Sequence, residues 1–430
     1  SQQNVYSHLA LNAVLEKYQY LEKKERAFIT RVTEGTLEHM IELDYILNQF
    51  SKVKVNKMKP VIRNILRSAV YQLKYMDSVP DSAVCNEAVK LAVKKGFGTL
   101  RGFVNGVLRN VARGLDQVEY PAEGIERLSV VYSMPEWILK LWKKTYDLDV
   151  IESMLQAFQE ETPVTIRCNL AKTTPENLKE SLQKEGVTVT PHPYLSYAFR
   201  IQDYDHLSEL ESFQKGEFYV QDISSMLVGE LADPKKGDRV IDVCAAPGGK
   251  ALHVAEKLRG TGSVEARDLS LYKVGLITEN IERSGLTNIH AVQKDATVCD
   301  ADVKDAADLV IADLPCSGLG VLAKKTDLKY KATEQGTKEL AGLQREILKN
   351  AASYVRPGGT LIYSTCTINP AENIENVHWF LKEFPEFVLD PIADRLCSTL
   401  QDSVEEAGCL QLLPGIHKSD GFFIARFGKK

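Results

Sequence analysis

Hydrophobic residues recur every three or four positions along the first quarter of the chain. This spacing predicts amphipathic helices in "LEHMIELDYILNQF", "KPVIRNILRSAVYQLKYM" and "AVCNEAVKLAVKK". Glycines punctuate the pattern at Gly96, Gly98 and Gly102, and no β-rich run appears between the helical segments. We therefore predict an all-α bundle over residues 1–125.

The pattern changes after this bundle. Two more helical segments, "PEWILKLWKKTY" and "IESMLQAF", precede a strand in "PVTIRCNL" and a capped helix in "TPENLKESLQKEG". Strands in "YAFRIQD" and "GEFYVQD" follow. Mixed helices and strands in this order predict a small α+β domain over residues 126–230.

From residue 231 onward, short apolar runs alternate strictly with segments of helix length. The runs "RVIDVCA", "GSVEARD", "IHAVQKD", "DLVIADLP" and "GTLIYSTC" predict the strands of a doubly wound, mostly parallel α/β sheet of the Rossmann-like kind. Two late runs, "CLQLLP" and "GFFIARF", have no obvious helix between them and predict an antiparallel edge. We assign residues 231–430 to this third domain.

Composition narrows the class of protein. A length of 430 residues favours several domains, and 44% hydrophobic with 26% charged residues is typical of a globular protein. No apolar run could span a bilayer, and no signal-peptide pattern opens the chain. We therefore expect a cytoplasmic protein that does not associate with membranes. We also expect a monomer. The eight cysteines are scattered, with no C-x-x-C pair and no Cys/His cluster; we therefore expect reduced thiols and no metal site.

Charge is distributed unevenly along the chain. Residues 1–120 carry 18 lysines and arginines against 12 acidic residues, a net of +6 in a chain whose total is −5. A local basic face on an acidic protein is typical of a phosphate-backbone binder, although a basic run alone is more often a solvated helix face. The candidate RNA-binding residues lie in "SKVKVNKMKPVIRNILR" and are Lys52, Lys54, Lys57, Lys59, Arg63 and Arg67.

Candidate ligand groups follow the first three strands of the predicted sheet, where open α/β sheets bind their ligands. The turn "DVCAAPGGK" offers paired glycines and a helix N-terminus, which suit a carboxylate as well as a phosphate. Asp268 ends the second strand, where an acid can bind ribose hydroxyls, and Asp295 ends the third, where an acid can line an adenine pocket. Each acid alone is more often a helix N-cap, but three suitable groups in succession favour a nucleoside site.

Two cysteines follow the next two strands. Cys316 lies in "DLPCSGLG" after Asp313, and Cys366 lies in "YSTCTINP". A single cysteine at a strand end is usually a small hydrophobic residue. Two on adjacent strand ends, beside a nucleoside site, indicate thiol chemistry in which a thiolate is the nucleophile.

These motifs resemble a known family. "VCAAPGGK", "DLPCSGLG", "LQREILKNAASYVRPGGTLIYSTCTINPAEN", "DGFFIARF" and "FYVQDISSMLV" are similar to the S-adenosylmethionine-dependent RNA cytosine-C5 methyltransferases. "RGFVNGVLRNVAR" is similar to the terminal helices of NusB. A NusB-like bundle ahead of such a catalytic domain resembles the RsmB (Sun/Fmu) family, and the likeness spans nearly the whole chain.

The resemblance implies methylation of cytosine C5 in 16S ribosomal RNA, the expected partner. It assigns nucleophilic attack on C6 to Cys366 and the release step to Cys316, with Asp313 against the polar edge of the base and Lys250 against the base or cofactor. It also implies that S-adenosyl-L-methionine binds at the turn after the first strand and at the acids after later strands. These cofactor-binding residues are Cys244, Ala245, Ala246, Pro247, Gly248, Gly249, Lys250, Asp268, Asp295 and Asp313.

Three alternatives compete with this interpretation. The same chemistry could act on transfer RNA, because phosphate contacts position a protein without specifying sequence. The chain could be a non-catalytic RNA-binding assembly factor, although both cysteines and all the cofactor acids are present. A nicotinamide enzyme fits worst, because G-x-G-x-x-G is missing and the two thiols stay unexplained.

Overall fold

The computed structural model describes residues 7–18, 20–160 and 162–430. It divides into two compact units, one formed by residues 1–159 with 322–331 and the other by residues 160–321 with 332–430. The helices α7 to α9 thus belong to the helical unit, and the two sheets share the other unit. The three-domain division with boundaries at 125 and 230 stays a prediction.

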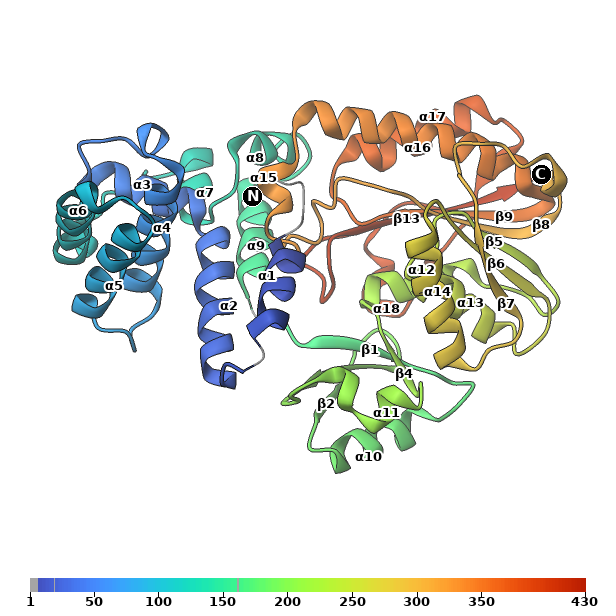
Figure 1. Cartoon of the computed structure of the whole chain (residues 1–430). Coiled ribbons are helices and arrows are strands. Elements are labelled where there is room, and N and C mark those ends of the chain that lie inside the picture. Colours follow the sequence, from blue (N-terminus) through green and yellow to red (C-terminus); the bar gives the residue numbers. More distant parts are fainter. Residues whose placement is uncertain (1–6, 19, 161) are drawn as a thin grey trace. The chain divides into compact units, whose positions relative to one another are not determined.

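The first unit is helical, as its hydrophobic spacing predicts (Figure 1). Its core is formed mainly by aliphatic side chains from α3 to α6, with Leu47, Leu66 and Leu108 fully buried. No helix in the described residues is both long and apolar enough to cross a membrane. The helices are α1 (Ser7–Leu15), α2 (Lys23–Glu38), α3 (Met40–Phe50), α4 (Pro60–Tyr75), α5 (Asp81–Lys94), α6 (Arg101–Gly114), α7 (Gly124–Val131), α8 (Glu136–Trp142), α9 (Leu148–Gln159) and α15 (Leu328–Lys331).

Helix α15 joins this unit from a distant part of the sequence. The Nζ of Lys329 donates a hydrogen bond to the backbone oxygen of Glu38 at 2.8 Å. Lys329 is only 4% exposed, and burial lowers its pKa to about 8. Residues 328–331 therefore pack as part of the helical unit.

A buried acid holds the helical unit together around α3 and α4. Glu42 accepts hydrogen bonds from Lys74, Tyr75 and, at 2.8 Å, the hydroxyl of Tyr120. Burial raises the pKa of Glu42, but hydrogen bonds from His39, Lys74 and Tyr75 outweigh burial and lower the pKa to about 2. The ionised carboxylate is thus favoured in the folded chain.

We predict that Glu42→Gln destabilises the helical unit by about 3 kcal/mol at neutral pH, the free energy that corresponds to the lowered pKa. In the unchanged protein this contribution is present above the ordinary carboxyl pKa of 4.5 and is lost as pH falls toward about 2. Urea unfolding of the full chain measures it, and hydrogen exchange of residues 40–50 locates it. Glu87→Gln, at an exposed acid on α5, is the matched control and should change little.

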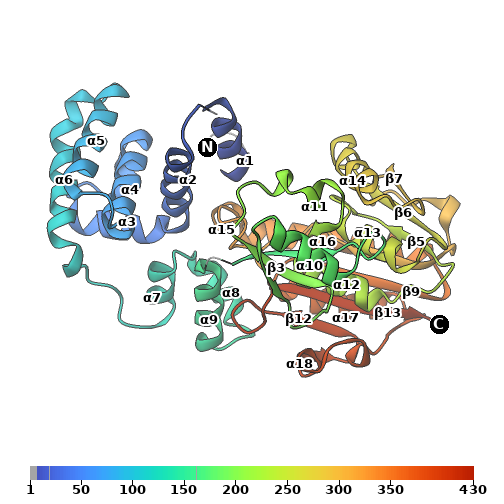
Figure 2. The ribbon, with the colours of Figure 1, turned by 90° about the horizontal axis from the view of Figure 1, so that it is seen from below.

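The second unit begins with a small antiparallel sheet of order β2-β3-β1-β4. Leu178 and Leu182 of α10 pack against Ile166, Phe199 and Phe218 of this sheet. Figure 2 shows α10 and α11 beside strand β3. The sequence analysis found three of the strands and α10 but missed β2. The elements are β1 (Val164–Cys168), α10 (Pro175–Lys184), β2 (Thr188–Pro191), β3 (Ala198–Gln202), α11 (Glu211–Gln214) and β4 (Phe218–Val220).

A large mixed sheet of order β11-β12-β13-β9-β8-β5-β6-β7 completes the unit, with β10 paired to β13. Strands β5 to β9 are parallel, and β13 runs antiparallel to β9, as predicted for the late strands. The strands are β5 (Arg239–Asp242), β6 (Ser263–Asp268), β7 (Ile289–Gln293), β8 (Ala307–Asp313), β9 (Val355–Thr365), β10 (Phe387–Leu389), β11 (Val404–Glu406), β12 (Cys409–Leu412) and β13 (Phe422–Lys429).

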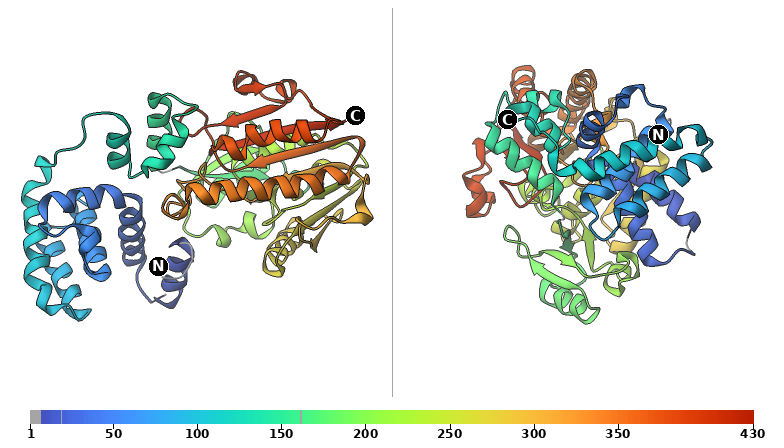
Figure 3. Two further views of the ribbon diagram at one scale, coloured as in Figure 1. Left: turned by 90° about the horizontal axis from the view of Figure 1, so that it is seen from above. Right: turned by 90° about the vertical axis from the view of Figure 1, so that its left-hand side faces the viewer.

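Helices cover both faces of this sheet because successive strand residues point to opposite sides. Val240 and Ile311 pack toward α12 and α13, whereas Ile241 and Val310 pack toward α16. In the left view of Figure 3, the long orange helix α16 crosses one face. These helices are α12 (Ile223–Ala232), α13 (Gly249–Lys257), α14 (Leu271–Ser284), α16 (Glu334–Tyr354), α17 (Ile374–Glu383) and α18 (Ser398–Gln401).

Candidate functional site

Two thiols meet at the carboxyl ends of neighbouring parallel strands. Cys316 follows β8 and Cys366 follows β9, and their Sγ atoms are 3.0 Å apart. The backbone N–H of Cys366 also donates to the Cys316 sulfur at 3.3 Å. Both side chains are partly exposed, and neither forms a disulfide. The predicted pairing of two thiols in one crevice agrees with this geometry.

The thiol pair is electrostatically unequal. The pKa of the Cys316 thiol is raised well above its ordinary value, chiefly by the hydrogen bond with Cys366 and then by burial. A charge on Cys366 and the charge of Glu372 raise it further. Cys316 is therefore harder to ionise than an ordinary thiol.

Asp313 and Lys250 form an ion pair beside the thiols. The parallel register of β8 and β9 sets Asp313 opposite Ser364, whose hydroxyl donates to Asp313 Oδ1 at 2.8 Å. Lys250 Nζ lies 2.8 Å from Asp313 Oδ2 and 5.3 Å from the centre of the Phe422 ring. Burial lowers the pKa of Lys250, but the negative charges of Asp313, Asp242 and Cys366 outweigh burial and raise it. The site thus holds a cation that is fixed by Asp313 and that interacts electrostatically with Cys366.

The turn after β5 is the segment for which the sequence predicts ligand binding. It runs from 243 to 248 and leads into α13, and its Gly248 has φ +106°, a conformation that side-chain-bearing residues rarely adopt. An added Cβ at Gly248 would make only an ordinary contact with Ile277 Cγ2 at 3.4 Å, so the positive φ rather than lack of space favours glycine here. The turn therefore requires glycine where it approaches α14.

A buried acid lies directly before this turn. Asp242 is 0% exposed, its Oδ1 accepts from the backbone N–H of Cys244 at 3.3 Å, and its buried Oδ2 has no partner among the described residues. Burial and then the negative charge of Asp313 raise the pKa of Asp242 to about 8. A buried acceptor without a partner fits a ligand that carries a positive charge and N–H donors, as S-adenosylmethionine does.

The predicted ribose acid, Asp268, lies at the end of β6 and is 4% exposed. Its Oδ2 accepts from the backbone N–H of Ala246 at 3.1 Å, and Lys273 lies 3.3 Å from its Oδ1. Asp268 therefore fixes the turn after β5 as well as facing the strand ends. Asp295, by contrast, lies two residues beyond β7, is exposed, and accepts hydrogen bonds from the hydroxyl and N–H of Thr297.

The predicted RNA-binding residues lie in or just before α4. Lys52, Lys54, Lys57 and Lys59 are exposed. Arg67 differs, because it forms a two-bond ion pair with Asp44 at 2.5 and 2.6 Å that offsets its charge. Arg63 is partly buried. The free basic surface is therefore narrower than the sequence analysis predicts, and consists mainly of the four lysines.

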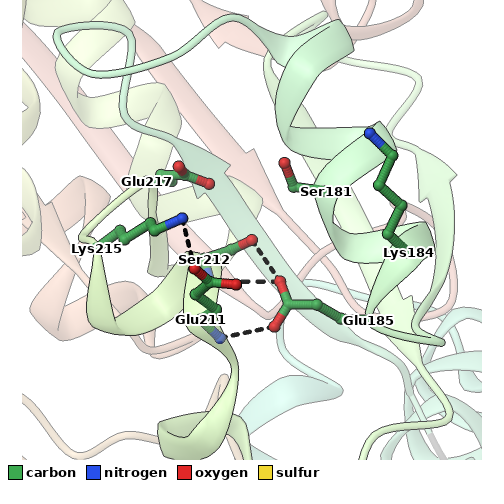
Figure 4. A pocket seen from close by; sticks show the side chains of 7 residues that line it. All are labelled: Ser181, Lys184, Glu185, Glu211, Ser212, Lys215 and Glu217. Carbon is green, nitrogen blue, oxygen red and sulfur yellow. Dashed lines mark hydrogen bonds and ion pairs between the residues drawn. The ribbon is translucent and has the colours of Figure 1, made fainter.

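A small hollow lies on the small sheet domain (Figure 4) and is lined by residues of both charges. Glu185 accepts from the Ser212 hydroxyl at 2.5 Å and the Glu211 N–H at 2.6 Å, and Lys215 pairs with Glu211 at 2.7 Å. These groups satisfy one another, so the hollow offers no ligand site comparable to the thiol pair. Among the residues in the described ranges, no cluster of three or more His, Cys, Asp and Glu side chains is arranged for a metal.

The sequence analysis missed a buried polar network behind the thiols. Its centre is Glu372, in the short helix Pro370–Glu372, with Ser317 and Gln344 as hydrogen-bond donors. The one available signal was the acid in "NPAEN" directly after a predicted buried strand. Gln344 lies on α16, and no local pattern indicates that its amide turns toward the site.

Three family models match the chain. "16S rRNA methyltransferase RsmB/F" matches residues 230–428, "NusB family" matches residues 1–113, and the "Methyltr_RsmF/B-like, ferredoxin-like domain" matches residues 134–205. These matches agree with the predicted order of a helical region, a small mixed domain and a methyltransferase domain.

Curated relatives cover the same length. The "Probable ribosomal RNA small subunit methyltransferase B" of Bacillus subtilis is 37% identical over 100% of this chain and 96% of its own. Its counterpart in Synechocystis is 33% identical over 99% and 95%.

Solved structures also match. PH0851 has a TM-score of 0.82 at 26% identity, covering 97% of this chain and 93% of its own. NSun6 from Pyrococcus horikoshii, solved with SFG, has a TM-score of 0.59 at 25% identity, covering 72% and 98%. The chain therefore belongs to the RsmB/F family of S-adenosylmethionine-dependent 16S rRNA methyltransferases.

Proposed function

We propose that this chain methylates C5 of a cytosine in 16S ribosomal RNA through a covalent bond between Cys366 and C6 of the base. The observation that carries the proposal is the pair of thiols at neighbouring strand ends, 3.0 Å apart, beside the Lys250–Asp313 ion pair. Cytosine C5 is a weak nucleophile, and addition of a thiolate to C6 converts the ring into an enamine that reacts at C5. One thiol then serves the addition and a second group serves the release.

Different residues of the site carry out addition to C6, recognition of the base and binding of the cofactor. Cys366 adds to C6 as the thiolate, stabilised beforehand by the Lys250 cation. Asp313, held by Ser364 and Lys250, accepts a hydrogen bond from the polar edge of the base. The turn after β5, with Asp242 and Asp268, would hold S-adenosylmethionine, which supplies an electrophilic methyl group on a sulfonium. The base has to leave its stack or be presented in a loop to reach the strand ends.

Cys316 serves the release step. Its pKa is raised by the hydrogen bond with Cys366, then by burial, and then by the charge of Cys366. Once the sulfur of Cys366 is bonded to C6, that charge is absent, so Cys316 loses its proton more easily. The resulting thiolate takes the C5 proton, and the C6–sulfur bond breaks to restore the aromatic ring.

Methylation assays on two RNA classes test the proposal. Purified protein is incubated with S-adenosylmethionine and either transcribed 16S ribosomal RNA or transfer RNA, and the nucleosides are separated by mass. We expect 5-methylcytidine from the ribosomal RNA. Product from transfer RNA alone would favour the transfer-RNA alternative, and a methylated base other than 5-methylcytidine would refute the proposed chemistry.

The basic lysines before α4 fit the same substrate. Lys52, Lys54, Lys57 and Lys59 are exposed in a stretch that contains no acid. Phosphate contacts of this kind contribute affinity without sequence specificity. We therefore assign these lysines to backbone binding and leave the choice of cytosine to the catalytic unit.

A further inference from the structure

A buried carboxylate connects the two loops that carry the thiols. Glu372 is 0% exposed. Its Oε1 accepts hydrogen bonds from the backbone N–H of Ser317 at 2.9 Å and from Gln344 Nε2 at 3.1 Å. Its Oε2 accepts from the Ser317 hydroxyl at 2.6 Å and from Asn369 Nδ2 at 2.9 Å. Both oxygens are thus fully engaged as acceptors.

This pattern is that of an ionised carboxylate. Gln344 Nε2 also donates to the backbone oxygen of Pro315, and Asn369 Oδ1 accepts from the backbone N–H of Ala371, so both amides turn their NH₂ groups toward Glu372. A carboxylate accepts all four of these hydrogen bonds when the Thr367 hydroxyl donates to the Ser317 hydroxyl. None of the four donors carries a charge. Glu372 therefore places a negative charge behind the thiols.

The charge acts unequally on the two sulfurs. Ser317 follows Cys316 directly, and its hydroxyl lies 2.8 Å from that of Thr367, which follows Cys366. The neighbour of Cys316 thus binds Glu372 directly, whereas the neighbour of Cys366 reaches it through the Ser317 hydroxyl, and Asn369, three residues beyond Cys366, also binds it. On the other side, the Lys250 cation interacts with Cys366. The charge of Glu372 thus contributes to the raised pKa of Cys316, and a charge on Cys366 contributes to the raised pKa of Lys250.

We propose that Glu372 is the positioning residue of the thiol pair: it holds the Ser317 loop against the Thr367 loop, and its charge keeps the shared proton on Cys316 so that Cys366 reacts as the thiolate. The inference rests on the proposed roles of the two cysteines. When the pair ionises, one proton leaves to water and the other stays between the sulfurs. The remaining charged and titratable groups around the pair are Lys250, Asp313, Asp242 and the Tyr363 hydroxyl.

Alkylation of the full chain tests this inference without RNA or methyl donor. Iodoacetamide labels the protein between about pH 6 and pH 9, the range in which perturbed thiols titrate. Peptide mass spectrometry then gives the rates of Cys316 and Cys366 separately. In the unchanged protein Cys366 should react at the lower pH. In Glu372→Gln, which removes the charge at nearly constant size, the Cys366-to-Cys316 rate ratio at neutral pH should fall about tenfold, one pKa unit.

Two variants separate the charge from mere packing. Glu372→Asp keeps the charge and should leave the ratio within about threefold of the unchanged protein, less than half a pKa unit. Ser317→Ala removes the bridging hydroxyl but keeps the charge, and should leave the ratio within the same limit. A purely structural role of Glu372 predicts instead that Ser317→Ala changes the ratio as much as Glu372→Gln does.

Three results would overturn the proposal: an unchanged ratio in folded Glu372→Gln, an equal change in Ser317→Ala, or lower-pH labelling of Cys316 in the unchanged protein. The last comparison needs no variant, so it decides the matter even if Glu372→Gln fails to fold. The alkylation experiment contains neither RNA nor S-adenosylmethionine, so its result does not depend on methylation. Failure of the proposed function is recognised separately, by the absence of 5-methylcytidine in the methylation assay.

Discussion

Cys366→Ala is expected to lower the rate of methylation at least about a thousandfold and to abolish covalent RNA binding, because no other thiol in the crevice is placed to ionise first. Cys316 keeps its proton through its hydrogen bond with Cys366 and through burial. Replacing Cys316 by alanine should instead cause the covalent complex of protein and RNA to accumulate. Addition to C6 and methyl transfer proceed in Cys316→Ala, whereas release fails, so protein and RNA stay joined.

A denaturing gel with ribosomal RNA and S-adenosylmethionine distinguishes these outcomes. Cys316→Ala should give a band of protein joined to RNA, whereas Cys366→Ala and the double variant should give none. Cys299→Ala, at an exposed cysteine outside both motifs, is the matched control and should methylate normally. A joined band that appears in Cys366→Ala but not in Cys316→Ala would reverse the assigned roles.

The strands of the large sheet could be predicted from the sequence because the apolar pattern of each strand lies within a few consecutive residues. Each central strand is a short apolar run buried on both faces, and the residue types after the run mark the ends at Asp268, Asp313 and Cys366. Parallel connections bring those ends to one edge, so order along the chain implied proximity in space. The 3.0 Å contact between the thiols follows from this topology.

The polar support of the site had no such local signal. Glu372, Gln344 and Ser317 come from a short helix, a long helix and a strand-exit loop, and only packing brings them together. Strand β2 was missed because four residues with a proline at the end carry little β pattern. The position of α15 in the helical unit likewise could not be predicted from the sequence, because Lys329 and its partner Glu38 are 291 residues apart.

The clearest case of a long-range partner is the ion pair of Arg167 and Glu256. Arg167, on β1 of the small sheet, is 0% exposed, and its NH1 lies 3.1 Å from Glu256 on α13. Its Nε donates to Gln221 at 2.7 Å, and its guanidinium lies 4.4 Å from the centre of the Tyr219 ring. A single arginine in "PVTIRCNL" would be expected to face solvent. Instead it joins the small sheet to the catalytic sheet's helices.

Arg167→Met is therefore expected to destabilise the two-sheet unit by about 3–5 kcal/mol at pH 8, because it leaves Glu256 buried without a counter-charge. Burial raises the pKa of Glu256 even with Arg167 present, and removal of the cation raises it further. Below the ordinary carboxyl pKa of 4.5, Glu256 is protonated in both folded and unfolded chains and the loss is smallest. The loss grows as pH rises from there through the raised pKa of the folded state.

Urea unfolding of the full chain at several pH values measures this loss. Arg356→Met provides the matched control, because its ion pair with Asp308 is about half exposed on the arginine side, and we expect a loss of at most about 1 kcal/mol. The double variant Arg167→Met with Glu256→Leu removes both charges and should regain at least about 2 kcal/mol at pH 8. A pH-independent loss, equal in the single and double variants, would show that Arg167 acts through packing on Tyr219 rather than through its charge.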